Sequence, residues 1–193
     1  MKEFILASQS PRRKQLLEWA EMEFEIIVQS TDESFPETLA IDQVPIHIAR
    51  QKALAVKKHV QTAFHKQYAT MPILAADTIV VLEGRVIGKP VDKEDAVQIL
   101  QSLSGQWHQV ITGVVLLNGD QEIAFSDITD VKFHTLTHEQ IVYYVDKYQP
   151  YDKAGAYAIQ EWIGVVGIET IKGDFYNVMG LPVSRVVKAL AQL

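Results

Sequence analysis

The sequence predicts a fold that mixes helices and strands, either α/β or α+β, around one mixed sheet. Runs with helical spacing alternate with short strand-like runs along the chain. Tight-turn signals separate two pairs of strand-like runs, "EGR" at 83–85 and "NGD" at 118–120. Tight turns join antiparallel strands, so the sheet is predicted to be mixed rather than purely parallel.

The first third of the chain is predicted to contain two strands and two helices. Phe4–Ala7 is a short apolar strand, and Ser10 followed by Pro11 is a typical helix start. Residues 24–30 form a second strand. An acidic loop then leads to a helix over 46–60, where apolar residues recur at helical spacing.

The rest of the chain continues the alternation. The predicted elements are two strands in 71–88, a helix at 92–105, a hairpin in 107–134, a helix at 137–148, a strand at 162–173 and a helix at 182–193. Asp92 is expected to cap its helix and Gly105 to end it, and Thr137 opens a T-x-x-Q capping box. Neither an internal repeat nor a linker rich in Gly, Ser or Pro stands out, so one domain over residues 1–193 is expected.

Composition limits the class of protein. The 193 residues are 48% hydrophobic and 22% charged, which is ordinary for a soluble globular protein. The net charge of −6 disfavours a nucleic-acid partner, and the lack of cysteine excludes disulfides, thiolate metal sites and thiol nucleophiles. The N-terminal apolar run is too short for a signal peptide, and no run suffices for a membrane helix. A cytoplasmic protein without a membrane partner is expected.

Two arginines stand where a helix begins, directly after the first predicted strand. The positive end of the helix dipole favours acidic residues there by roughly 0.3–1 kcal/mol, so Arg12 and Arg13 indicate an anion. Ser8 and Ser10 add hydroxyl groups, and the N–H groups of a helix N-terminus suit a phosphate. A capped helix with solvated arginines explains the same residues equally well.

Two places carry candidate catalytic carboxylates. Asp77 follows the apolar run "ILAA", where an unpaired charge would be costly to bury. It could bind Mg²⁺ or deprotonate a water molecule, although a hydrogen-bonded Asp at a strand end would look the same. Asp32 and Glu33 lie in the acidic loop, where a solvated carboxylate is the ordinary interpretation.

The remaining polar candidates are weaker when taken singly. Lys52 lies in a helix whose charged face explains it, whereas Lys89 is held between a glycine and a proline. Gln160 offers a donor and an acceptor that suit the edge of a nucleobase, but an exposed Gln is equally plausible. Among the histidines, His108 is the single candidate for a site.

Pooled together, these residues indicate phosphate chemistry. The sequence has neither a G-x-x-x-x-G-K-[ST] phosphate loop nor a G-x-G-x-x-G fingerprint, and a G-x-S-x-G nucleophile motif is also absent. Carboxylates that can hold a divalent ion, combined with lysines and arginines, suit metal-assisted attack of water on a phosphate chain.

Several ordered motifs resemble the Maf family of nucleoside triphosphate pyrophosphatases, whose fold is related to that of the ITP pyrophosphatases. They are "LASQSPRRKQLL", "DES", "ARQKA", "AADTIVVLEGRVIGKP", "LSGQWHQVITGV", "DKAGAYAIQ" and "GDFYNVMGLPV". The resemblance implies an α/β fold, with a twisted mixed sheet, flanking helices and two lobes around a cleft. "AADT" together with "DKAGAYAIQ" is similar to the branch that hydrolyses dTTP and UTP.

The resemblance also implies a role for each candidate. Asp77 matches the proton acceptor, and Glu33 with Asp77 matches the site of a divalent metal cofactor, Mg²⁺ or Mn²⁺. The positions that match residues holding the triphosphate are Ser8, Arg13, Lys52 and Lys89, and the two lysines are expected to serve catalysis together with Glu33. The positions that match base specificity are Arg12, Thr78 and Gln160. A homodimer is a family-level expectation.

Two other functions stay open on the sequence. One is a nucleotide-responsive regulator of septum formation and cell division, which would not need Asp77 as a base. The other is a pyrophosphatase with another base preference, for 7-methyl-GTP or modified pyrimidines. Family members often have a glycine after the Gln, whereas in the "IQEW" of this chain Gln160 is followed by Glu161. The loop near the base is therefore expected to differ.

Overall fold

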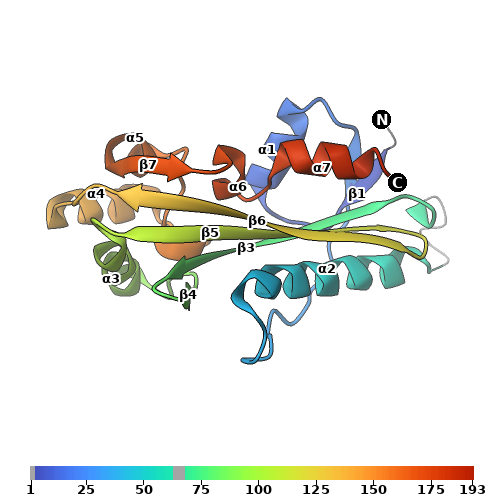
Figure 1. The fold of residues 1–193 in the computed structure, drawn as a ribbon, viewed down its shortest axis with the longest axis horizontal. Helices are drawn as coiled ribbons and strands as arrows, with labels where there is room; N and C mark the ends of the chain where they lie inside the picture. The colour runs from blue at the N-terminus through green and yellow to red at the C-terminus, as the bar shows by residue number, and fades with distance from the viewer. Residues whose placement is uncertain (1–2, 63–67) are drawn as a thin grey trace. The chain divides into compact units, whose positions relative to one another are not determined.

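The computed structural model describes residues 3–62 and 68–193, and these contain a seven-stranded mixed sheet flanked by helices (Figure 1). The strands are β1 (Phe4–Leu6), β2 (Phe24–Ile26), β3 (Ile73–Leu82), β4 (Arg85–Ile87), β5 (Trp107–Asn118), β6 (Gln121–Phe133) and β7 (Ile168–Lys172). Their order is β2-β1-β3-β5-β6-β7, with β4 paired to β3. β1 is parallel to β2 and β3, whereas β3–β4 and β6–β7 are antiparallel, which confirms the mixed sheet.

The helices are α1 (Pro11–Trp19), α2 (Val44–Val60), α3 (Lys93–Leu103), α4 (His138–Tyr148), α5 (Trp162–Gly167), α6 (Phe175–Val178) and α7 (Val183–Leu190), with 3₁₀ turns η1 (Ile41–Gln43) and η3 (Ala154–Ala156). The helices α1, α3 and α4 begin where their capping residues predict. Ser10, Asp92 and Thr137 each accept a backbone N–H of the first turn, as predicted. Within the described ranges, no helix has the length and apolar character needed to cross a membrane.

The chain divides into two compact units. Unit 1 consists of the described residues of 1–77 with Thr112–Asp127 and Gly180–Leu193, and unit 2 consists of Thr78–Ile111 and Ile128–Met179. β3, β5 and β6 each contribute residues to both units. This division agrees with the two lobes that the resemblance implies, while the cleft stays a prediction.

The core of unit 1 places α2 against the sheet. Figure 1 shows α2 along one side of the strands, with α1 and α7 on the other. Ala49 and Ala53 are fully buried in a cluster with residues of β1, β3 and β5. A Cβ on Gly113 of β5 would lie 2.2 Å from the backbone N of Ile46, so only glycine lets α2 approach this closely.

One predicted element is wrong. Residues 162–173 form the helical turn α5 followed by β7, rather than one strand. The β-branched residues of this segment favour a strand, but its glycines permit a tighter path. The N–H of Gly164 donates to the carbonyl of Glu161 at 2.9 Å, and a Cβ on Gly164 would lie 1.7 Å from the carbonyl oxygen of Ile159. Tertiary packing therefore overrides local propensity here.

Candidate active site

The start of α1 holds a buried arginine in a fixed position. Arg13 is only 8% exposed, and its Nε donates to the carbonyl of Gly180 at 2.8 Å. Its Nη1 donates to Oγ of Ser8 at 3.1 Å, and the same oxygen accepts the N–H of Ser10 at 3.2 Å. The solvated alternative therefore fails for Arg13, because two independent acceptors orient its guanidinium.

The pKa of Arg13 is lowered, chiefly by burial. Burial lowers the pKa of Arg13, the negative charge of Asp77 raises it, Arg12 lowers it, and Glu33 raises it. Because a guanidinium stays protonated at neutral pH even so, the site retains a buried cation. A buried cation is stabilised by nearby negative charge, so this position favours an anion.

A lysine joins the two predicted catalytic carboxylates. Nζ of Lys52, on α2, lies 2.7 Å from Oε1 of Glu33 and 2.7 Å from Oδ1 of Asp77. The side chains of Lys52 and Asp77 are 17% and 13% exposed, whereas that of Glu33 is 48% exposed. Asp77 lies inside β3 and pairs with a lysine, so the alternative of a carboxylate that caps a turn at a strand end is wrong.

The two carboxylates are ligands of the type that a divalent cation prefers. Across residues 3–62 and 68–193, no group of three or more His, Asp or Glu side chains could hold a metal ion. Mg²⁺ in proteins is nevertheless commonly held by one or two carboxylates, with water and substrate phosphates completing its shell. Glu33 and Asp77 already share one cation, the ammonium of Lys52, so their placement suits positive charge.

The predicted residues divide between the two units. Those of unit 1 are Ser8, Arg12, Arg13, Glu33, Lys52 and Asp77. Thr78, Lys89 and Gln160 belong to unit 2, where Thr78 is half-buried on β3. Lys89 is exposed, and the carbonyl of the preceding Gly88 accepts the N–H of Gly155 at 3.1 Å.

His108 is a buried residue that packs among aromatic rings of unit 2. It is 2% exposed, and its Nε2 lies 2.7 Å from the hydroxyl of Tyr157. Its ring also stacks on Phe133, with centroids 5.4 Å apart. Burial lowers the pKa of His108 from 6.5 to about 4, so the imidazole is neutral at physiological pH.

This burial predicts an acid-sensitive fold. In the unfolded chain His108 takes up a proton near pH 6.5, but in the folded protein only near pH 4. The free energy of unfolding therefore falls as the pH drops between these values, by up to about 3 kcal/mol from this residue. Urea unfolding of wild type and His108→Gln from pH 7 to pH 4 measures the effect. The variant should show a shallower pH dependence, and equal slopes would contradict the assignment.

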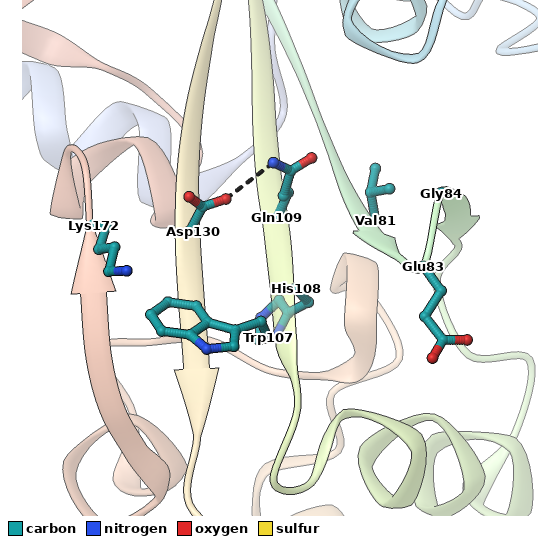
Figure 2. A pocket seen from close by; sticks show the side chains of 8 residues that line it. All are labelled: Val81, Glu83, Gly84, Trp107, His108, Gln109, Asp130 and Lys172. Atoms are coloured by element: carbon teal, nitrogen blue, oxygen red, sulfur yellow. Dashed lines mark hydrogen bonds between the residues drawn. The ribbon is translucent and has the colours of Figure 1, made fainter.

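Unit 2 also contains a pocket whose lining includes His108. It has a volume of about 330 Å³ and is lined by Val81, Glu83, Gly84, Trp107, His108, Gln109, Asp130 and Lys172 (Figure 2). Nε2 of Gln109 donates to Oδ1 of Asp130 at 3.0 Å, the dashed contact in Figure 2. Nζ of Lys172 lies 4.5 Å from the ring centroid of Trp107. Apart from His108, none of the predicted site residues lines this pocket.

Sequence reasoning missed two residues, one in each unit, that make hydrogen bonds to a predicted site residue or to the neighbours of one. Gly180 acts through its backbone carbonyl on Arg13, and no side-chain pattern could indicate this. Tyr144 looks like one more apolar position of a predicted helix, yet its hydroxyl contacts Ala158 and Glu161 beside Gln160. Both are long-range contacts that only the folded chain makes.

Comparison with known proteins assigns the family. The model of the family described as "Maf-like protein" matches residues 3–193. The chain belongs to the Maf family. A Maf relative from Bacteroides fragilis, named dTTP/UTP pyrophosphatase, is 45% identical over 190 residues, covering 98% of this chain and 95% of that protein. A relative from Halalkalibacterium halodurans with the same name is 47% identical over 190 residues, with the same coverage of 98% and 95%.

A weaker likeness is structural. The Ham1 protein of Staphylococcus aureus has a TM-score of 0.44 and 15% sequence identity, covering 68% of this chain and 72% of its own. At that level the likeness has no bearing on function, and the family rests on the sequence matches.

Proposed function

We propose that this Maf-family chain hydrolyses dTTP and UTP to the nucleoside monophosphate and pyrophosphate. The observation that carries the proposal is the contact of Lys52 with both Glu33 and Asp77, in the same unit as the buried Arg13. The two relatives named dTTP/UTP pyrophosphatase, at 45% and 47% identity over nearly the whole chain, support the same activity.

Asp77 is the proposed general base. Its carboxylate takes a proton from a water molecule as the water oxygen forms a bond to the α-phosphorus. The bond from that phosphorus to the bridging oxygen breaks, and pyrophosphate leaves with the electron pair. The 2.7 Å contact with Lys52 holds Asp77 in one orientation, which a base needs if it is to meet a water in line with the leaving group.

The cations of the site are proposed to hold the triphosphate. Arg13 is already oriented by Ser8 and Gly180, so little side-chain ordering remains when the anion binds. Lys52 and Lys89 add two further positive charges. Glu33 and Asp77 would hold Mg²⁺ or Mn²⁺, which when bound offsets phosphate charge and polarises the phosphorus–oxygen bonds.

The base is proposed to be read by Arg12, Thr78 and Gln160. Uracil and thymine present an imide N–H between two carbonyl oxygens, and the amide of Gln160 can pair with one donor and one acceptor at once. Gln160 is exposed, so its amide is accessible to a ligand. We further propose that the enzyme acts in the cytoplasm, which its lack of cysteine suits, and that it forms a homodimer.

Turnover of a nucleotide panel tests this function. With Mg²⁺ or Mn²⁺, dTTP and UTP should be hydrolysed faster than CTP, purine nucleotides and 7-methyl-GTP, and excess EDTA should abolish the reaction. In ¹⁸O-labelled water the label should enter the monophosphate and not the pyrophosphate, because water attacks the α-phosphorus. Release of inorganic phosphate would contradict the reaction. Binding of dTTP and UTP without turnover would instead favour a nucleotide-responsive regulator of cell division.

A further inference from the structure

Gln160 stands at the exposed end of a buried segment of unit 2. Lys153 and residues 155–159 are buried, and Gln160 is the first exposed side chain after them. A turn closes around it, because the N–H of Glu161 donates to the carbonyl of Ala158 at 3.0 Å. The orientation of the Gln160 amide therefore depends on how firmly the turn at 158–161 is held.

One buried hydroxyl holds both ends of that turn. Tyr144 of α4 is 0% exposed, and its Oη accepts the N–H of Ala158 at 3.1 Å. The same hydroxyl donates its proton to Oε2 of Glu161. A donor and an acceptor on one rigid ring thus connect the residue that starts the turn to the residue that ends it.

The negative charge of the Glu161 carboxylate is partly compensated by a nearby lysine. Its Oε1 lies 3.6 Å from Nζ of Lys153, which in turn lies 2.7 Å from Oδ1 of Asp152. The side chains of Lys153 and Glu161 are largely removed from solvent, so the nearby ammonium helps to compensate the Glu161 carboxylate. Glu161 occupies the N-cap of α5 but makes no side-chain capping bond, and its carboxylate is directed to Tyr144 instead.

We propose that Glu161 and Tyr144 are positioning residues for Gln160 and thereby set the selectivity for uracil and thymine. The inference rests on the proposed function and deepens it. A pre-organised amide discriminates between bases because a mismatched partner leaves polar groups unpaired. When the turn loosens, the Gln160 amide can reorient to pair with either thymine or cytosine. The preference for dTTP over CTP therefore falls.

Steady-state kinetics with dTTP and CTP test the proposal. Glu161→Ala and Tyr144→Phe should each lower the ratio of kcat/KM for dTTP to that for CTP by about tenfold, the size of one lost hydrogen bond. The loss should appear as a higher KM for dTTP with kcat changed less than about twofold, because Asp77 is untouched. Glu161→Gln should restore most of the selectivity, since its amide oxygen still accepts from Tyr144.

The matched control is Glu169→Ala, an exposed glutamate on β7 of the same unit, which should leave the ratio unchanged. Combining Glu161→Ala with Gln160→Ala should lower selectivity no further than Gln160→Ala alone, because one residue acts through the other. An equal loss for dTTP and CTP, or additive losses in the double variant, would overturn the proposal. If Tyr144→Phe does not fold, the difference in selectivity between Glu161→Ala and Glu161→Gln still tests the proposal.

Binding of α,β-imido analogues of dUTP and dCTP separates this inference from the proposed function. These analogues cannot be cleaved at the reacting bond, so their affinity ratio reports base selectivity without turnover. If the wild type binds the dUTP analogue selectively but hydrolyses no nucleotide, the proposed pyrophosphatase activity is refuted and the positioning role is not. Normal turnover with an affinity ratio unaffected by Glu161→Ala would refute the positioning role alone.

Discussion

Asp77→Asn is expected to lower kcat for dTTP by about 10³-fold, within the range that a general base contributes. Asn has nearly the same shape as Asp, and its amide oxygen can still accept from Lys52, which lies 2.7 Å from Oδ1 in the wild type. An amide, however, cannot take a proton from water near neutral pH. The predicted loss therefore concerns chemistry more than binding, and KM for dTTP should change only a few-fold.

Pyrophosphate release at saturating dTTP measures this effect. Asp120→Asn is a matched control, because it removes the same charge from an exposed position of unit 1. The control should keep full activity. If Asp77→Asn retained more than about a tenth of the wild-type kcat, Asp77 could not be the base. A folded variant with unchanged nucleotide binding would in that case favour another proton acceptor.

Lys52→Met should lower kcat/KM for dTTP by about 10²- to 10³-fold, the usual cost of losing one charged group at a reacting centre. Lys52 contacts both Glu33 and Asp77 at 2.7 Å, so its removal leaves two carboxylates without their shared cation. Their negative charge would then oppose an incoming triphosphate. Methionine keeps the length and most of the packing of the side chain, so α2 should remain in place.

The control for this variant lies on the same helix. Lys58→Met removes a positive charge from an exposed position of α2, and it should leave kcat/KM unchanged. Raising the Mg²⁺ concentration should recover part of the activity of Lys52→Met, because a divalent ion can offset the exposed carboxylates. Equal activities of the two lysine variants would exclude Lys52 from the site.

The parts of the fold that sequence could predict are those governed by neighbours along the chain. Ser10, Asp92 and Thr137 cap their helices as expected, because a cap needs only a side-chain oxygen and a free N–H within the first turn. The hairpin around 118–120 follows from local turn chemistry in the same way. The segment 162–167 was predicted wrongly, since Gly164 packs against the Ile159 carbonyl, a contact that propensity does not report.

The candidate site was only partly predictable for the same reason. Asp77 stands out in the sequence, because a carboxylate inside an apolar strand requires a partner. That the partner is Lys52, and that Lys52 also reaches Glu33, depends on where α2 packs. His108 gives the opposite lesson, because a histidine beside a tryptophan in a strand can be buried and neutral.

The close approach of α2 to β5 has a consequence for mutational tolerance. Any side chain at position 113 would collide with the backbone of Ile46, which a Cβ would meet at 2.2 Å. The helix would have to move away from the strand, and Lys52 would move with it. Selection for activity would therefore conserve Gly113, although this residue has no side chain that could take part in the reaction. The geometry of Lys52, Glu33 and Asp77 therefore depends on the absence of a side chain at position 113 as much as on the charged groups themselves.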